Sequence, residues 1–536
     1  MIARAARPAL APLLALALAL APAPAAARPL AAAPVEWIEV GDPLLAELDL
    51  LAASGLADSA ITRFSGPLAR RDVAAYVARA RRLNPASQDA SLIRLERAFG
   101  REFALAGLPV RADYTAPLAT LEDADPAGDA DPMRFQLFGY VDAALDIDED
   151  GSQFADRSRF GGRANLTSGG LLVHLDVWAG RVDDASRFTD VLVTGSEFAA
   201  MAEDAYVSWA SRSFDVTLGR RRNAWGPGAT GTLLWSRQAA PVTELSFGGT
   251  LFRHLRVTAS HGDVDASRDA RIAAHRLEWF PSPVLTVGLH EAARYTSSQW
   301  EPLYVVGLLP YTFVQRLQSE DALDATGEAE EVRNNVMAGL DATWRPLPGG
   351  ELRGELLLDD QNLKSSGSPT RIGYQLGGLW TRPFAALGAG ARWRVRGEYS
   401  RVYNYVYATW YGEDFIHHGR PIGYPVGPDS RTWFASVGAS PSATWDAALT
   451  ALWSDRGEGE LGTYYDPADT ATAASGSTLS GVVEHTRSLG GEARFEPRDG
   501  IAFTLGVGYT WVEDVDHQAG VDEERWLARV GLRLRK

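Results

Sequence analysis

Hydrophobic and polar residues alternate along most of the chain, from Met133 to its end. Residues 336–344, 352–358 and 391–399 are clear examples. A period of two is typical of β-strands that have one apolar and one polar face. About 18 such segments occur, each of roughly the 9 to 11 residues that a tilted strand needs to cross a membrane. The pattern therefore predicts strands that span a bilayer.

The connections between these segments alternate in length. Short connections, such as 168–170, 346–350 and 440–442, alternate along the chain with long ones, such as 222–242, 295–332 and 402–429. Outer-membrane barrels place short turns on the periplasmic rim and long loops on the extracellular rim. We therefore predict an all-β transmembrane barrel of about 18 antiparallel strands over residues 133–536.

The first part of the chain has a different pattern. Residues 1–27 combine Arg4 and Arg7 with an Ala/Leu-rich stretch and end in Ala25, Ala26 and Ala27, which indicates a signal peptide. Residues 28–115 are expected to form a small α-helical periplasmic module with helices near 43–54, 67–84 and 89–106. Residues 116–132 are rich in Pro, Asp and Ala and are expected to be a linker.

Composition narrows the possible functions. The net charge is −16, which would repel a phosphate backbone and argues against binding to nucleic acid. No cysteine is present, so a disulfide framework, a thiolate zinc site and a catalytic thiol are excluded. Clusters of acidic residues on the long loops are expected to be a solvated rim. We expect no cofactor and no metal site.

Several short motifs, taken in their order along the chain, resemble the capsule-assembly Wzi family of outer-membrane proteins. They are Trp225, Gly226, Pro227 and Gly228; Asn335; Asp359 and Asp360; and Gly427, Pro428, Asp429 and Ser430. The resemblance implies an 18-stranded barrel with a periplasmic helical bundle that acts as a surface lectin for capsular polysaccharide. It implies binding or assembly of capsular or extracellular polysaccharide without turnover, so the protein is not expected to be an enzyme. Outer-membrane lipid or lipopolysaccharide is an expected neighbour, and the polysaccharide-export machinery and peptidoglycan are further candidate partners.

Two groups of residues are candidates for binding an acidic polysaccharide. A series of arginines alternates with aromatic and apolar residues along one predicted strand. If the aromatic residues face lipid, the arginines line the lumen, where each guanidinium group can bind a carboxylate by two contacts. The alternative is that these arginines pair with Glu355, Asp359 and Glu398 and stiffen the barrel. Aromatic side chains of the long loop 402–429 can pack against sugar rings, or can instead belong to a folded loop. The predicted residues are Arg353, Arg392, Arg394 and Arg396 in the lumen and Tyr403, Tyr405, Tyr407 and Trp410 in the loop.

Three other functions compete with a polysaccharide-binding barrel. A barrel of this size can leave a water-filled channel, which lumenal arginines would make an anion-selective porin. The N-terminal module can instead tether a structural barrel to the cell wall, since residues 50–81 weakly resemble an S-layer homology repeat. Asp414, His417 and His418 lie close in sequence and would be needed by a hydrolase. No strand-borne serine accompanies them.

Overall fold

The computed structural model describes residues 36–122, 133–149, 151–156, 158–182, 191–192, 196–211, 213–252, 254–265, 269–307, 309–321, 334–359, 370–409, 412–462 and 478–536. The predicted signal peptide at 1–27 lies outside these residues.

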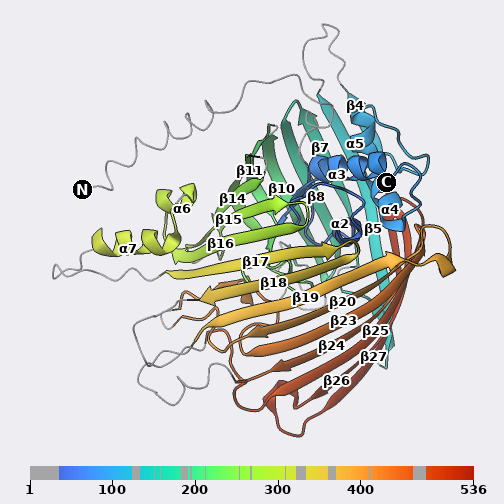
Figure 1. The fold of residues 1–536 in the computed structure, drawn as a ribbon. Helices are drawn as coiled ribbons and strands as arrows, with labels where there is room; N and C mark the ends of the chain where they lie inside the picture. Colours follow the sequence, from blue (N-terminus) through green and yellow to red (C-terminus); the bar gives the residue numbers. More distant parts are fainter. Residues whose placement is uncertain are drawn as a thin grey trace.

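Eighteen antiparallel strands in the described part of the chain close into one barrel (Figure 1). The last strand pairs with the first, with Leu534 opposite Val141, so the sheet has no free edge along this seam. This closure confirms the predicted all-β barrel. The strands are β5 (Arg134–Asp148), β7 (Arg159–Ser168), β8 (Leu171–Arg181), β10 (Phe198–Ala210), β11 (Phe214–Arg221), β13 (Val242–Leu251), β14 (Leu255–Asp263), β15 (Ala270–Ser282), β16 (Leu285–Thr296), β17 (Asn335–Leu347), β18 (Gly350–Asp359), β19 (Ile372–Pro383), β20 (Arg392–Val402), β23 (Ser430–Ser442), β24 (Trp445–Arg456), β25 (Glu484–Arg498), β26 (Ile501–Glu513) and β27 (Glu523–Arg535).

The alternating sequence pattern separates the two faces of the barrel wall. On β18, Leu352 and Leu356 point outward and are 52% and 36% exposed, whereas Arg353 and Glu355 are buried in the interior. Because successive residues of a strand point to opposite faces, an apolar outer face and a polar lumen follow directly from the sequence.

The N-terminal residues form a compact helical module. Its helices are α2 (Leu44–Ser54), α3 (Arg70–Leu83), α4 (Ala90–Ala98) and α5 (Gly100–Leu105), with short strands β1 (Trp37–Ile38), β2 (Ser65–Gly66) and β3 (Leu68–Ala69). Leu51, Val77 and Leu95 lie in its buried core. The helix expected over 89–106 is divided at Phe99 into α4 and α5. None of the described helices is long and apolar enough to span a bilayer.

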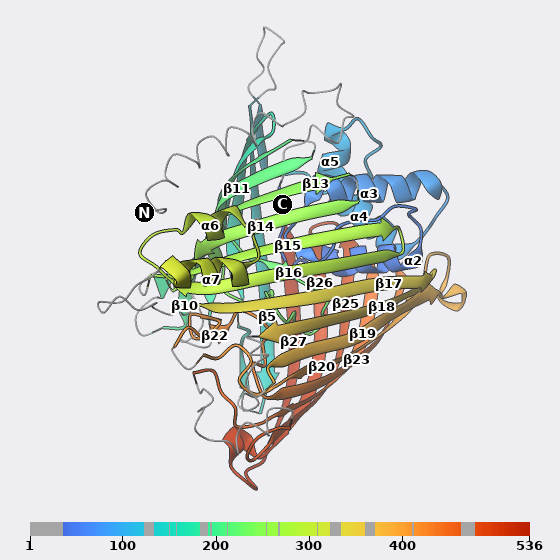
Figure 2. The same ribbon diagram turned by 60° about the vertical axis from the view of Figure 1, so that its left-hand side comes forward.

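The module enters the barrel at the rim with the short turns (Figures 1 and 2). Arg94 of α4 donates to the carbonyl oxygens of Ser442 and Ala443, both at 3.0 Å, in the turn between β23 and β24. The N–H of Gly349, in the turn between β17 and β18, donates to the carbonyl oxygen of Ala53 at 2.6 Å. The long loops contain helices and short strands of their own. They include α6 (Pro302–Val306), α7 (Tyr311–Asp321), β6 (Gly151–Phe154), β9 (Val191–Leu192), β12 (Ala224–Trp225), β21 (Ile416–His417), β22 (Arg420–Pro421) and the 3-10 turn η5 (Val515–His517), whereas the 3-10 turn η4 (Ala385–Leu387) belongs to a short connection.

Part of the predicted linker is a strand. Within residues 116–132, β4 (Ala119–Glu122) pairs with the first residues of β5, while 123–132 lie outside the described residues. The pairing of the C-terminal residues with β5 ends at Gly139, which exchanges two backbone hydrogen bonds with Lys536, so the start of β5 has no partner from β27. β4 takes this place and satisfies backbone groups that would otherwise be an open edge.

Candidate functional site

The long loop between β11 and β13 folds into the lumen and meets the helical module there. Its strand β12 pairs with β2 of the module, with Trp225 opposite Ser65. The N–H of Gly226 donates to the carbonyl oxygen of Phe64 at 3.0 Å. The interior of the barrel is therefore crossed by a contact between elements that enter from opposite rims.

A second long loop, 403–429, packs on the first and forms an apolar core inside the barrel. The shared core includes Leu233 and Trp235 from the first loop and Tyr407, Phe415 and Ile422 from the second, all at most 1% exposed. Met337 and Leu357 point inward from the wall and complete this cluster. Apolar burial of this extent stabilises the loops in the lumen.

Three carboxylates of the barrel wall hold these loops by accepting backbone N–H groups. Glu398 accepts from Ala229 at 2.6 Å and Thr230 at 2.9 Å. Glu355 accepts from Leu233 at 2.8 Å, and Asp359 accepts from Tyr407 at 2.7 Å. Each of these side chains accepts N–H groups of a different stretch of main chain, so each fixes one stretch of loop.

The motif at 225–228 lies where the loop, the module and the wall meet. Gly226 has φ of +125°, and a Cβ there would come within 2.5 Å of the Glu355 carboxylate. A Cβ on Gly228 would lie 2.0 Å from the carbonyl oxygen of Gly231. The carbonyl oxygen of Pro227 accepts from Arg353 at 3.2 Å. The glycines are therefore required by close approach of the backbone.

The other family-motif residues also anchor loops. Asn335 donates to the carbonyl oxygen of Tyr407 at 3.4 Å. Asp429, with φ of +51°, accepts from the N–H groups of Gly459 and Ser480 at 3.2 and 3.0 Å. Ser430 donates to the carbonyl oxygen of Gly427 at 2.8 Å. Asp360 lies outside the described residues.

The predicted arginines do line the interior, but their partners differ from those expected. Arg392 pairs with Asp89, the N-cap of α4, and Arg394 makes two contacts to Asp446 at 2.8 and 2.7 Å. Carboxylates of the module and wall therefore pair with both guanidinium groups, and binding of a polysaccharide to these arginines stays a prediction.

Asp49 of α2 is the common partner of the remaining arginines. It lies 2.8 Å from Arg353, 2.8 Å from Arg63 of the module and 3.4 Å from Arg396. The expected pairing of the arginines with Glu355, Asp359 and Glu398 is wrong, because those three side chains bind the loops instead. Ion pairing does stiffen the barrel, but it does so by docking the module.

The predicted aromatic site divides in the structure. Tyr407 is fully buried and its hydroxyl donates to the carbonyl oxygen of Leu233 at 2.6 Å, so it anchors the loop, as the alternative of a folded loop expected. Tyr403 and Tyr405 are half-buried. Trp410 lies outside the described residues.

Two adjoining cavities of about 480 and 640 Å³ lie between the module and the wall. They share Glu39, Arg159, Arg494 and Arg533 among their lining residues. Both volumes are in the range of small-ligand sites. The larger cavity is lined by more arginines than carboxylates, namely Arg159, Arg221, Arg222, Arg237, Arg420, Arg494, Arg529 and Arg533 against Glu39, Asp142, Asp156, Glu203, Asp204 and Glu492.

Arg237 is a candidate that the sequence did not reveal. It lies on loop 222–241, lines the larger cavity and donates to the carbonyl oxygen of Ala229 at 3.2 Å. No carboxylate in the described part of the chain forms an ion pair with it, and its side chain is exposed. The signal in the sequence was the apolar run 233–235 within a polar loop, which indicates a loop that folds inward.

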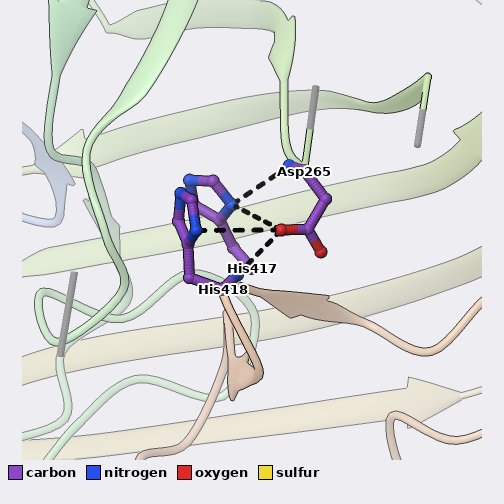
Figure 3. A group of neighbouring side chains, drawn as sticks. All are labelled: Asp265, His417 and His418. Carbon is purple, nitrogen blue, oxygen red and sulfur yellow. Dashed lines mark hydrogen bonds and ion pairs between the residues drawn. The ribbon is translucent and has the colours of Figure 1, made fainter. Parts of the chain in front are cut away.

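His417 and His418 have a carboxylate partner other than Asp414, with which the sequence grouped them. His417 and His418 face Asp265 from the loop between β14 and β15 (Figure 3). Asp414 instead accepts the N–H of Thr409 at 2.8 Å.

Comparison with known proteins places these features in context. Residues 140–525 match the model of a family described as capsule assembly protein Wzi. A comparison with curated proteins finds no significant match. One similar solved structure is Wzi of Escherichia coli, described as an outer membrane protein involved in group 1 capsule assembly and a carbohydrate-binding β-barrel. It has a TM-score of 0.61 and 15% sequence identity, with 94% of this chain and 99% of that chain covered.

Two further solved structures are more distant. OprD of Pseudomonas aeruginosa has a TM-score of 0.42 and 10% identity, with 75% of this chain and 95% of that chain covered. An anion-selective porin from Comamonas acidovorans has a TM-score of 0.35 and 12% identity, with 75% and 99% covered. The likeness to the Escherichia coli barrel shows a common fold.

Proposed function

This chain belongs to the Wzi family of capsule assembly proteins, and we propose that it binds an acidic capsular or extracellular polysaccharide at the outer membrane without turning it over. The observation that carries the proposal is a contact that crosses the lumen. The helical module and loop 222–241 meet inside the barrel through β2 and β12. An interior crossed in this way favours binding over passive diffusion of solutes.

The loops give the barrel a folded surface on the side of the long connections. Residues of 222–241 and 403–429 pack on each other and on the wall. Such a surface can present fixed polar groups to a polymer that lies outside the cell, since a bound ligand is recognised by pre-positioned side chains. The half-buried Tyr403 and Tyr405 remain candidates for contact with sugar rings.

The charge of the larger cavity supports an acidic ligand. The whole chain is acidic, with a net charge of −16, yet arginines outnumber carboxylates around this cavity. Guanidinium groups bind carboxylates with two well-oriented hydrogen bonds. Arg237 reaches the cavity from an extracellular loop and is the residue that we expect to contact an acidic sugar.

The position of the module supports a periplasmic location and suggests its partners. The module occupies the rim with the short turns, which faces the periplasm in outer-membrane barrels. The polysaccharide-export machinery or peptidoglycan would meet it there. Outer-membrane lipid and lipopolysaccharide would contact the apolar outer face of the strands.

Binding of glycans by Arg237→Gln tests the proposal. The full chain in detergent is applied to an array of acidic and neutral polysaccharides. Since a charge-assisted hydrogen bond contributes about 1.5–3 kcal/mol, we expect roughly tenfold or greater weakening for acidic glycans and no change for neutral ones. Arg79→Gln is the control, because Arg79 lies on an exposed part of α3 away from this cavity.

Three results would contradict parts of the proposal. Unchanged binding by Arg237→Gln would remove the cavity as the site. A large and steady conductance in planar bilayers would favour the anion-selective channel. Release of shortened glycan by the purified protein would show turnover.

A further inference from the structure

The cluster of Asp265, His417 and His418 lies where three long loops meet. Asp265 belongs to the loop that joins β14 to β15, and the two histidines belong to the hairpin of β21 and β22 near the tip of loop 403–429 (Figure 3). Pro241, at the end of loop 222–241, is the next neighbour, because its carbonyl oxygen lies 3.3 Å from Nε2 of His417.

The three side chains present one ligand atom each within a small volume. The ligand atoms all lie within 4.8 Å of one another. Nδ1 of His417 and Nδ1 of His418 are each 3.9 Å from Oδ1 of Asp265. Ligand atoms around a tetrahedral zinc ion are about 3.3 Å apart, given bonds of about 2.0–2.2 Å. The two 3.9 Å separations would have to shorten by about 0.6 Å, and the widest separation by up to about 1.5 Å, for the three atoms to coordinate one ion.

The surroundings of His417 fix which of its nitrogens carries the hydrogen. A carbonyl oxygen can only accept, so Nε2 of His417 donates to Pro241. Nδ1 accepts the N–H of Asp265 at 3.3 Å, so its electron pair points toward that residue. A carbonyl that orients the far nitrogen is the usual support of a metal-binding histidine.

The backbone holds Asp265 and His418 in position. Both have positive φ angles, +48° and +51°, which non-glycine residues adopt infrequently. The N–H of His418 also donates to Oδ1 of Asp265 at 3.1 Å. The carboxylate and the second imidazole are thus oriented toward each other by the main chain.

We propose that Asp265, His417 and His418 bind one divalent transition-metal ion of the zinc class, which fastens loop 403–429 over the lumen. Two imidazole nitrogens with one carboxylate oxygen suit such an ion better than calcium or magnesium, which prefer oxygen ligands alone. The ion would replace the 3.3 Å contact at Nδ1 of His417. It would join the loop to β14 and β15 in addition to the apolar core.

Titration with zinc chloride tests the site. The full chain, prepared without a histidine tag and held in detergent, is titrated in a calorimeter. We expect saturable binding of one ion per chain, and at least tenfold weaker binding for His418→Gln and Asp265→Asn. His418 is 40% exposed, so its replacement leaves the fold intact, and heat-dependent migration on a denaturing gel verifies this.

The matched control is His485→Gln. His485 also pairs with a carboxylate, its Nδ1 lying 2.8 Å from Asp455, but the described residues place no second imidazole beside this pair. We expect this variant to bind zinc as the wild type does. No saturable binding, or equal affinity in His418→Gln, would overturn the proposed site.

Hydrogen exchange tests the fastening of the loop. Residues 416–421 form the hairpin of β21 and β22, so their exchange reports opening of the loop. Zinc is expected to slow exchange there at least severalfold in the wild type and not in His418→Gln. Binding of zinc without slower exchange would overturn the role of the ion in holding the loop.

Discussion

The module end of the lumen is held largely by buried ion pairs, whereas the loop end is held by an apolar core and by carboxylates that accept backbone N–H groups. Asp49 and Asp89 of the module meet Arg353 and Arg392 of the wall. At the other end, Glu398 binds the backbone of loop 222–241. The same strand, β20, supplies an arginine to one end and a carboxylate to the other.

This difference indicates how each end forms. The module has a core of its own, which includes Leu51 and Leu95, and it docks as a folded unit through charged contacts. The loops have no separate core, because Phe415 and Trp235 pack together with Met337 and Leu357 of the wall. The loops therefore fold only with the barrel, and the two ends should respond differently to the same treatment.

Truncation of the apolar core should have the largest effect, and only at the loop end. Phe415→Ala removes a fully buried ring. Loss of such a side chain costs about 3–5 kcal/mol, so we expect much faster hydrogen exchange in residues 403–429 and unchanged exchange in the module. Phe252→Ala is the control, because Phe252 is 87% exposed. Equal loosening of the module would mean that the ends are not independent.

Acid should release the module before the loops. Burial raises the pKa of Asp49, but the guanidinium groups of Arg353 and Arg63 hold it well below its usual range. A carboxyl with a lowered pKa stabilises docking above its unfolded value of about 3.9, and this contribution is lost as the pH falls below about 4. Burial instead raises the pKa of Asp414 in the second loop. Protonation of Asp414 at low pH therefore removes the cost of burying its charge and does not weaken the loop. Pepsin at pH 2.5 should cut the module while residues 403–429 stay protected.

Replacement of Asp49 by a neutral residue separates its contribution to docking of the module from that of the other acidic residues. Asp49→Asn leaves the buried arginines short of a partner and should weaken docking by about 2–3 kcal/mol at neutral pH. Hydrogen exchange in the module measures this loss. Asp72→Asn, on α3 with a side chain 61% exposed, is the matched control. Simultaneous release of both ends on acidification would contradict the assignment of ion pairs to one end.

The barrel could be predicted from the sequence because its signal is local. Leu352 and Leu356 alternate with Arg353 and Glu355, and this alternation sets the faces of β18 whatever lies elsewhere. The helices of the module were predicted for the same reason, and Gly55, with φ of +75°, ends α2 where the predicted helix over 43–54 ends. The division at Phe99 was missed because the apolar spacing continues across it.

The interior could not be predicted, because its contacts join residues far apart in the chain. Arg392 and Asp89 are separated by 303 positions, and Asp265 and His417 by 152. The arginines were assigned to the lumen correctly from alternation, but alternation does not identify a partner. For Tyr407, contact with a sugar and a place in a folded loop both stayed open, because nothing local shows that its loop turns inward.

Removal of one hydroxyl should have the smallest effect, and it tests how much the wall carboxylates contribute. Thr230 donates its hydroxyl to Glu398 at 2.6 Å, in addition to the two backbone N–H groups. Thr230→Val should cost about 1.5 kcal/mol and speed exchange in loop 222–241 roughly tenfold. Thr230→Ser keeps the hydroxyl and should behave as the wild type. If valine and serine behave alike, the side chain contributes nothing measurable, and the loop end depends on its apolar core more strongly than the module end depends on any single contact.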